Sequence, residues 1–383
     1  MRQRKSNLKV MTIVGTRPEI IRLSRVIILL DESVNHILVH TGQNYDYELN
    51  EIFFKELGLR KPDYFLNADV SSLGATVGDI IKKSEEVLRK ERPDAVVVLG
   101  DTNSCLSAYM AKRLKIPIYH MEAGNRCFDF NVPEEINRRI IDHIADFNLV
   151  YTENARRHLI SEGLPHRRTY LIGSPMREVL EYYRPHIEAS SALEQLHLEP
   201  DKYFLVSMHR EENVDNTENL LSLLLSLNAL EERYGQPIII STHPRTRKRL
   251  EAIGPIRKSD LQRFLKPFGY FDYVKLQLHA RCVLSDSGTI SEESAILSFP
   301  AVTLRNALER PEAIDTGSIL LTGVQKETIL DAVELVIDEH ALGNPAHVPM
   351  DYCVRNTSWR VLKLILGTAK LSNKWWGVIE SRT

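Results

Sequence analysis

Short runs of β-branched and aliphatic residues alternate with longer amphipathic segments through most of this 383-residue chain. In the first half these runs are KVMTIV, HILVH, DAVVVLG, IPIYHM, FNLVY and TYLIG. Most of them are followed by a helical pattern, such as the one predicted over Asp46–Leu57, which Gly58 would end. This alternation is typical of parallel strands joined by crossover helices. The sequence therefore predicts an α/β fold.

The pattern pauses after Gly173 in the polar stretch RPHIEASSALEQLHLEPD and resumes with KYFLVS, QPIIIST, RCVLSDSG and FPAVTL. We therefore expect two α/β domains, over residues 1–173 and 174–355, followed by a C-terminal helix and tail over residues 356–383. Apolar residues recur at helical spacing in that last segment, which predicts a helix docked on an apolar surface. They are Trp359, Leu362, Ile365 and Leu366.

Composition excludes several classes of protein. Hydrophobic residues make up 43% and charged residues 26% of the chain, which excludes disorder as its main state. The net charge of −2 argues against nucleic-acid binding, and the basic run Arg245–Arg249 is then a solvated helix face. No apolar run reaches the roughly 18 residues of a membrane span, and the N-terminus lacks a signal-peptide cleavage site.

The four cysteines are far apart and include no C-x-x-C pair. They are Cys105, Cys127, Cys282 and Cys353. This spacing fits neither a zinc site nor a disulfide framework. We therefore expect a cytoplasmic protein.

Ligands of open α/β sheets bind outside the carboxyl ends of the strands, so the residues that follow each strand are the informative ones. After the first strand, Gly15 permits a tight turn and Arg17 lies at a helix N-terminus, an arrangement that suits a phosphate or pyrophosphate. The alternative is that Arg17 pairs with Glu19 or stays in solvent. The turn contains no G-x-G-x-x-G, so a nicotinamide cofactor is not expected there.

Carboxylates follow two further strands of the first domain. Asp101 and Glu122 lie at adjacent strand ends, where two acids can serve general acid/base chemistry. Glu134 and Glu135 start a predicted helix, with Arg138 one turn later. For these two glutamates the residues alone favour a helix-dipole effect of about 0.3–1 kcal/mol.

The second domain has a matching set of polar strand ends. His209 and His243 each lie near an arginine, and such cationic donors suit a diphosphate leaving group. Ser287, Gly288 and Thr289 offer hydroxyls and backbone N–H groups at a helix start, which would form an anion cradle.

Two other interpretations of these residues have less support. A metal site is disfavoured because the histidines lie on separate loops without an H-x-H or H-E-x-x-H pattern. A catalytic triad of Ser207, His209 and Asp101 would lack the G-x-S-x-G elbow.

Eight segments together resemble, in order and spacing, the motifs of the non-hydrolysing UDP-N-acetylglucosamine 2-epimerase family. They are GTRPEIIR, LGDTNS, HMEAGNR, VPEEINRR, MHREEN, STHPRTR, SDSGTISEE and LRNALERPEAI. The resemblance covers essentially the whole chain. It implies two Rossmann-like domains in a GT-B-like architecture, an active site in the interdomain cleft, a C-terminal helix packed back on the N-terminal domain, and a homodimer. It implies neither a metal nor a cofactor.

The resemblance also assigns residues. The catalytic residues it implies are Asp101, Glu122, Glu134 and His209. The substrate-binding residues it implies are Arg17, Arg22, Arg138, His243, Ser287, Gly288, Thr289 and Glu293. Glu134 thereby gains a role that the helix-dipole interpretation does not give it.

The implied activity is that of an isomerase that eliminates UDP from a UDP-N-acetylhexosamine, forms a 2-acetamidoglycal and adds UDP back. The chain departs from the glucosamine epimerases at Arg22, at the loop Cys127–Val132, at Thr289 and in HTGQNYDYELNEIFF. These departures resemble the branch that forms UDP-N-acetyl-L-fucosamine from UDP-2-acetamido-2,6-dideoxy-L-talose for surface polysaccharide.

Four alternatives stay open. The first is a UDP-N-acetylglucosamine/UDP-N-acetylmannosamine 2-epimerase. The others are a UDP-sugar glycosyltransferase of the same fold, a hydrolysing epimerase and a non-catalytic UDP-sugar sensor.

Overall fold

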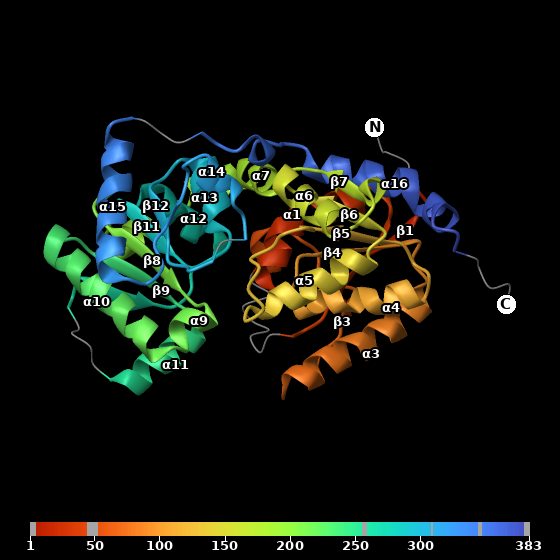
Figure 1. Ribbon diagram of the computed structural model, residues 1–383, viewed down its shortest axis with the longest axis horizontal. Coiled ribbons are helices and arrows are strands. Elements are labelled where there is room, and N and C mark those ends of the chain that lie inside the picture. The colour runs from red at the N-terminus through yellow and green to blue at the C-terminus, as the bar shows by residue number, and fades with distance from the viewer. Residues whose placement is uncertain (1–4, 44–52, 255–258, 308, 344–346, 379–383) are drawn as a thin grey trace. The chain divides into compact units, whose positions relative to one another are not determined.

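The computed structural model describes residues 5–43, 53–254, 259–307, 309–343 and 347–378, and the chain divides into two units (Figure 1). The first unit comprises Met1–Glu181 together with Met350–Thr383. The second unit comprises Tyr182–Pro349. The N-terminal and C-terminal parts of the chain therefore belong to the same unit.

The first unit contains a seven-stranded sheet in the order β3-β2-β1-β4-β5-β6-β7, and every pairing in it is parallel. Its strands are β1 (Lys9–Val14), β2 (Asn35–His40), β3 (Tyr64–Phe65), β4 (Ala95–Leu99), β5 (Ile118–Met121), β6 (Phe147–Val150) and β7 (Thr169–Leu171). Its helices are α1 (Arg17–Ser33), α3 (Leu73–Glu91), η1 (Asn103–Ser107), α4 (Ala108–Arg113), α5 (Pro133–Ile144), α6 (Glu153–Ser161), η2 (His166–Arg168), η3 (Met350–Tyr352) and α16 (Thr357–Trp375). Helix α7 (Met176–Glu188) contains the point where the chain passes to the second unit.

The second unit contains a six-stranded parallel sheet in the order β10-β9-β8-β11-β12-β13. Its strands are β8 (Phe204–Met208), β9 (Ile238–Thr242), β10 (Gln262–Leu265), β11 (Cys282–Ser285), β12 (Ala301–Thr303) and β13 (Leu320–Leu321). Its helices are α8 (Ala192–Leu196), α9 (Glu211–Val214), α10 (Thr217–Tyr234), α11 (Pro244–Ile253), α12 (Tyr270–His279), α13 (Ile290–Leu297), α14 (Glu312–Asp315) and α15 (Lys326–Ala341).

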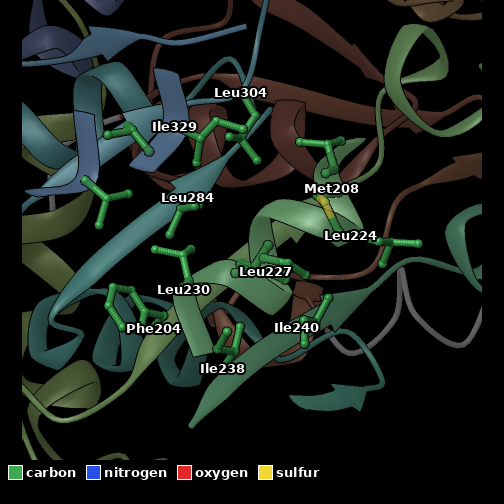
Figure 2. Close-up of a cluster of buried hydrophobic side chains, with 14 of the residues drawn as sticks. Phe204, Met208, Leu224, Leu227, Leu230, Ile238, Ile240, Leu284, Leu304 and Ile329 are labelled. Carbon is green, nitrogen blue, oxygen red and sulfur yellow. The ribbon is translucent and has the colours of Figure 1, made fainter. Parts of the chain in front are cut away.

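All ten hydrophobic runs of the sequence are strands, which confirms the predicted α/β class. The central strands are buried throughout, as in the AVVVL run of β4, because helices cover both faces of a parallel sheet. In the second unit, apolar side chains of β8, β9 and β11 pack with those of α10 (Figure 2). Figure 2 shows Phe204, Leu227 and Ile238 in this core.

Three strands escape prediction from the sequence: β3, β10 and β13. The first and last have two residues each, and the side chains of all three are only partly buried. Each is the last strand at an edge of its sheet, where no continuous apolar run is needed. Edge position thus explains why the hydrophobic pattern does not reveal them.

The polar stretch after Gly173 is largely helical and is not an irregular linker. Helix α7 runs to Glu188 in spite of Pro185, and α8 follows at Ala192. The boundary that the sequence suggests at 173/174 therefore precedes the transition between the units, which lies at Glu181 and Tyr182.

The predicted C-terminal helix is α16, which packs against α1 in the first unit. The hydroxyls of Tyr119 and Thr368 lie 2.6 Å apart and join this helix to β5. Leu362 and Ile365 are buried as predicted, whereas Trp359 and Leu366 are exposed. The buried face of the helix therefore includes fewer of the predicted residues than expected, and Val361 and Ala369 complete it.

Most of the predicted helix Asp46–Leu57 lies outside the described residues. Residues 53–56 are helical, and Gly58 takes the left-handed backbone (φ +63°) expected of a glycine that ends a helix. Among the helices of the described residues, none is long and apolar enough to cross a bilayer.

Both sheets reverse their strand order between two central neighbours, at β1/β4 in the first unit and at β8/β11 in the second. Such a switch point opens a crevice at the carboxyl ends of the strands, where ligands of α/β proteins bind. The sequence-predicted site residues follow these strands.

Candidate functional site

The turn between β1 and α1 requires glycine at position 15. A Cβ at Gly15 would lie 2.5 Å from Thr41 Oγ1 and 2.9 Å from Ser104 Cβ, which no side chain tolerates. Helix α1 then starts at Arg17 with a proline in its first turn. The exposed Arg17 guanidinium lies over the Phe53 ring, 5.2 Å from its centroid. Arg17 is therefore held at the helix N-terminus, as predicted.

Glu19 does not pair with Arg17, which excludes one alternative for this turn. Its buried carboxyl accepts hydrogen bonds from the Gly15 amide (3.1 Å) and from the hydroxyls of Thr16 (2.8 Å), Thr102 (3.1 Å) and Ser104. Burial raises the pKa of Glu19 to about 7, although these hydrogen bonds act in the opposite direction.

Arg22, in the second turn of α1, forms an ion pair with Glu122, which follows β5; the two side chains are 3% and 10% exposed. The backbone of Glu122 is left-handed (φ +64°), which is uncommon outside glycine and turns this residue out of the strand direction. The Asn125 amide donates to the other carboxylate oxygen of Glu122 at 3.4 Å. The structure thus brings together two residues that the sequence assigned separately to substrate binding and catalysis.

Asp101 and Arg138 form a second ion pair, with Arg138 Nη2 and Asp101 Oδ2 2.7 Å apart. Arg138 is buried on α5, and the neighbouring Asn137 donates to the Asp101 carbonyl at 2.9 Å. Since β4 and β5 pair in parallel, Asp101 and Glu122 follow adjacent strands of the sheet. Each carboxylate therefore has a buried arginine beside it.

Glu134 and Glu135 are adjacent in sequence but differ in their surroundings. Glu135 is fully buried and bonds to the Cys127 amide (3.1 Å) and to Arg139 Nη2 (2.8 Å). Glu134 is half-buried, and in the part of the chain that the structure describes its carboxylate has no hydrogen-bond or ion-pair partner. The helix-dipole interpretation treats the two alike, whereas the structure makes Glu135 structural and leaves Glu134 available.

In the second unit, the site is organised by Asp286, a residue that sequence reasoning quoted in SDSGT without giving it a role. Its buried carboxylate lies 3.0 Å from His209 Nδ1 and accepts the backbone N–H groups of His209 and Arg210. Burial acts to raise the pKa of Asp286, but the charge of His209 and these hydrogen bonds outweigh it and hold the pKa below its usual range. Its position directly after the strand β11 is the sequence feature that could have identified Asp286 as a site residue.

His243 is exposed at the start of α11, where its Nδ1 accepts the Arg245 N–H at 3.3 Å. The His209 and His243 rings lie 6.3 Å apart between centroids. The structure therefore brings together the two histidines that sequence analysis singled out.

The turn Ser287–Thr289 precedes α13 and carries hydroxyls 3.0 Å apart. A Cβ at Gly288 would lie within 3.4–3.7 Å of Glu309, Arg210 and Arg305 side-chain atoms. Arg310 donates to the Gly288 carbonyl and pairs with Glu292 at 3.2 Å. Arginines thus surround the predicted anion cradle.

The structure adds arginines to the sequence assignment of this cradle. Arg305 and Arg310 lie in quoted motifs but were given no role, and Arg210 was considered only as the arginine next to His209. The predicted ligand-binding residue Glu293 is buried and accepts the Gln277 amide at 2.7 Å. The common position of the three arginines could not be predicted, because only the fold brings residues 210, 305 and 310 to one turn.

No group of three His, Cys, Asp or Glu side chains within the described ranges is arranged to hold a metal ion. Most of the segment HTGQNYDYELNEIFF lies outside those ranges. The chemistry that the described residues offer is acid/base catalysis by carboxylates in one unit and anion binding by imidazoles, hydroxyls and guanidinium groups in the other.

Comparison with known proteins identifies a family. Residues 29–366 match the family model described as UDP-N-acetylglucosamine 2-epimerase. The solved UDP-N-acetylglucosamine 2-epimerase from Rickettsia bellii is 51% identical, with a TM-score of 0.90 over 97% of this chain and 100% of that one. The UDP-GlcNAc 2-epimerase from Methanocaldococcus jannaschii, solved in complex with UDP-GlcNAc and UDP, is 35% identical, with a TM-score of 0.88 over 94% and 100%.

A more distant likeness concerns the fold alone. The glycotransferase of kitacinnamycin is 10% identical, with a TM-score of 0.56 over 94% of this chain and 99% of that one. Together with the epimerase structures, it confirms the predicted GT-B-like architecture.

Proposed function

Because the chain belongs to the UDP-N-acetylglucosamine 2-epimerase family, we propose that it interconverts UDP-N-acetylglucosamine and UDP-N-acetylmannosamine. Its membership makes it a nucleotide-sugar 2-epimerase-type isomerase. The observation that carries the proposal is the pair of strand-end carboxylates, Asp101 and Glu122, each with a buried arginine beside it.

The proposed reaction is elimination followed by addition. A base removes the C2 proton, the C2–H electron pair forms a C1–C2 double bond, and the C1–O bond breaks with its electrons going to the UDP phosphate. Protonation of the 2-acetamidoglycal at the other face of C2 and attack of the UDP oxygen on C1 give the epimer. This elimination and addition require no redox cofactor, because no carbon changes its oxidation state overall.

The first unit supplies the proton transfers in this proposal. Asp101, Glu122 and Glu134 act as acids and bases, and Arg22 and Arg138 hold the first two in position. What supports this is the ion pairing of Asp101 and Glu122 and the unengaged carboxylate of Glu134. Arg17 binds the diphosphate from its helix N-terminus.

The second unit binds the UDP. His209 and His243 stabilise the negative charge that develops on the departing diphosphate, where one preorganised donor is typically worth about 10²–10³ in rate. Ser287, Gly288 and Thr289 bind its oxygens with hydroxyl and N–H groups, and Glu293 contacts the uridine part.

A second substrate pair is UDP-2-acetamido-2,6-dideoxy-L-talose and UDP-N-acetyl-L-fucosamine. This pair rests on the departures from the glucosamine epimerases described above, among them Arg22, which contacts the proposed catalytic Glu122. The names of the relatives favour the glucosamine pair, so we rank the L-sugar second.

The test is incubation of the protein in D₂O with UDP-N-acetylglucosamine and with the L-talose nucleotide in separate reactions, followed by NMR at C2. Deuterium at C2 and formation of the epimer in the glucosamine reaction support the proposal. Label in the L-talose reaction alone replaces the first substrate pair by the second. Release of free sugar would make the enzyme hydrolysing, and UDP binding without exchange in either reaction would overturn epimerisation.

We also propose that the protein is a homodimer. Tyr109 on α4 and Ile136 and Ile140 on α5 are exposed apolar side chains on two helices that contact each other (Figure 1). A second copy of the chain would cover them. Light scattering of the double variant Ile136→Asp/Ile140→Asp should show a monomer; a persisting dimer would place the interface elsewhere.

Finally, we propose a cytoplasmic location. The four cysteines are free thiols, which is usual in a reducing compartment. Fractionation of the source cells with an antibody to the chain tests this, and recovery outside the cytoplasm would contradict it.

A further inference from the structure

Glu19 is a buried acid of the first unit that the proposed reaction does not use. It is 1% exposed and belongs to the first turn of α1. Among the described residues no arginine or lysine pairs with its carboxyl, and its four partners are an amide and three hydroxyls. A buried carboxyl without a cationic partner is costly, so its presence calls for an explanation.

An ordinary helix-capping role accounts for only half of these contacts. A glutamate in the third position of a helix commonly bonds to the residues just before the helix, as Glu19 does with Gly15 and Thr16. Thr102 and Ser104, however, are 83 and 85 residues away in sequence and belong to the segment after β4. These contacts are not needed to cap α1.

The two sets of contacts belong to the two loops at the switch point of the sheet. Gly15 and Thr16 form the turn that ends in Arg17, and Thr102 directly follows Asp101. One oxygen of Glu19 accepts from Gly15, Thr16 and Thr102, while the other accepts from Ser104. A single carboxyl thus joins the loop that carries the diphosphate-binding arginine to the loop that carries an acid/base carboxylate.

We propose that Glu19 is a positioning residue that fixes Arg17 and Asp101 relative to each other by joining their loops. This inference rests on the proposed function, because it takes the roles of those two residues from it. Misplacement of a reacting group by about 1 Å costs on the order of 10²-fold in rate, so such a joint affects turnover even though it touches no substrate.

Three variants separate this role from others. In Glu19→Gln, the amide oxygen keeps the bonds from Gly15, Thr16 and Thr102, and the amide NH₂ donates to the Ser104 hydroxyl, which can accept. Glu19→Asp is shorter by one methylene and cannot reach both loops. Glu19→Ala removes the joint.

The matched control is Asp146→Ala. Asp146 is also a buried carboxylate that bonds to a backbone amide, Ile118 N at 3.0 Å, and to a side chain, Lys112 Nζ at 2.5 Å. Asp146 directly precedes β6 and contacts the start of β5, so it lies at the amino ends of these strands, whereas Asp101 follows the carboxyl end of β4. Asp146→Ala should lower the midpoint of thermal unfolding without lowering kcat per folded molecule.

The experiment measures kcat and KM for the nucleotide sugar together with amide hydrogen exchange of residues 9–17 and 100–107. We expect E19Q to retain kcat, and E19A and E19D to lose about 10²-fold in kcat, with faster exchange in both segments. Exchange in these segments should not change in D146A.

Two results would overturn the proposal. If E19Q loses as much kcat as E19A, Glu19 takes part in proton transfer and does not only position other groups. If E19A keeps its kcat while its unfolding midpoint falls, the contacts are merely structural. A wild-type protein without epimerase activity would refute the proposed function instead, and the exchange measurements would still test whether Glu19 joins the two loops.

Discussion

The Asp286 carboxylate binds His209 twice, through the ring nitrogen Nδ1 at 3.0 Å and through the backbone N–H. These contacts link the ends of β8 and β11, the two strands between which the second sheet reverses its order. Because Asp286 engages Nδ1, the other ring nitrogen, Nε2, is the one that His209 presents to a ligand.

We predict that Asp286→Asn lowers kcat/KM by about 10²-fold, because the asparagine NH₂ conflicts with the backbone N–H groups of His209 and Arg210 and displaces the ring. Steady-state kinetics per folded molecule checks this. Asp215→Asn, which removes only the surface pair with Arg249, is the control and should behave as wild type. Unchanged kcat/KM in D286N would show that His209 does not depend on this contact.

Glu134 and Glu135 should separate activity from stability. We expect Glu134→Gln to lower kcat by about 10²–10⁴-fold, as loss of an acid or base does, without changing the unfolding midpoint. Glu135→Gln should instead lower the free energy of unfolding by about 3 kcal/mol, because it removes a fully buried charge that pairs with the buried Arg138 and with Arg139. Steady-state kinetics and urea unfolding of both variants test this prediction. A loss of stability in E134Q and a loss of kcat alone in E135Q would exchange the two roles.

The raised pKa of Glu19 predicts a pH dependence of stability. With a pKa of about 7 in the folded protein against 4.5 for an ordinary glutamate, the folded state binds more protons between these two values. The free energy of unfolding should therefore fall as the pH rises from 4.5 to about 7, by about 3 kcal/mol from this residue.

Urea unfolding of the wild type and of E19Q across this pH range measures that contribution, since all other groups cancel in the difference between the two proteins. As the pH rises from 4.5 to about 7, the free energy of unfolding of the wild type should fall relative to that of E19Q. A wild type that gains stability relative to E19Q as the pH rises would mean that Glu19 is ionised in the folded protein.

The ion pair of Arg22 and Glu122 predicts graded effects of substitution. Arg22→Ala removes the arginine that pairs with the largely buried Glu122 carboxylate, so we expect the free energy of unfolding to fall by about 3 kcal/mol and kcat to fall as well. Arg22→Lys keeps the charge but loses the planar fork, so both losses should be smaller. Urea unfolding and the NMR assay measure them, and an R22A protein as stable as wild type would contradict the pairing.

Much of the fold could be predicted from the sequence because parallel strands are buried on both faces. A strand such as β4 has only apolar residues, and this run is visible without any structure. The same physics explains the failures: β3 and β13 are two-residue edge strands that bury little. In α16, Trp359 and Leu366 have the spacing of a buried face but lie at its exposed margin.

The candidate site was predictable in part. Residues that follow central strands, such as Asp101 and His209, could be picked out by their polarity alone. The contacts between site residues could not be predicted, because Asp286 is 77 residues away from His209 in sequence and Arg138 contacts Asp101 from another element. The two glutamates of α5 show the same limit, since neighbours in sequence face different surroundings.

The first unit is assembled from both ends of the chain, with α16 as its last element. During translation, every residue of the second unit is therefore synthesised before α16, the helix that packs on α1. Until then α1 lacks the cover that α16 provides, and Tyr119 lacks the hydroxyl of Thr368. The order of synthesis thus makes the N-terminal unit, although translated first, the last of the two to be finished.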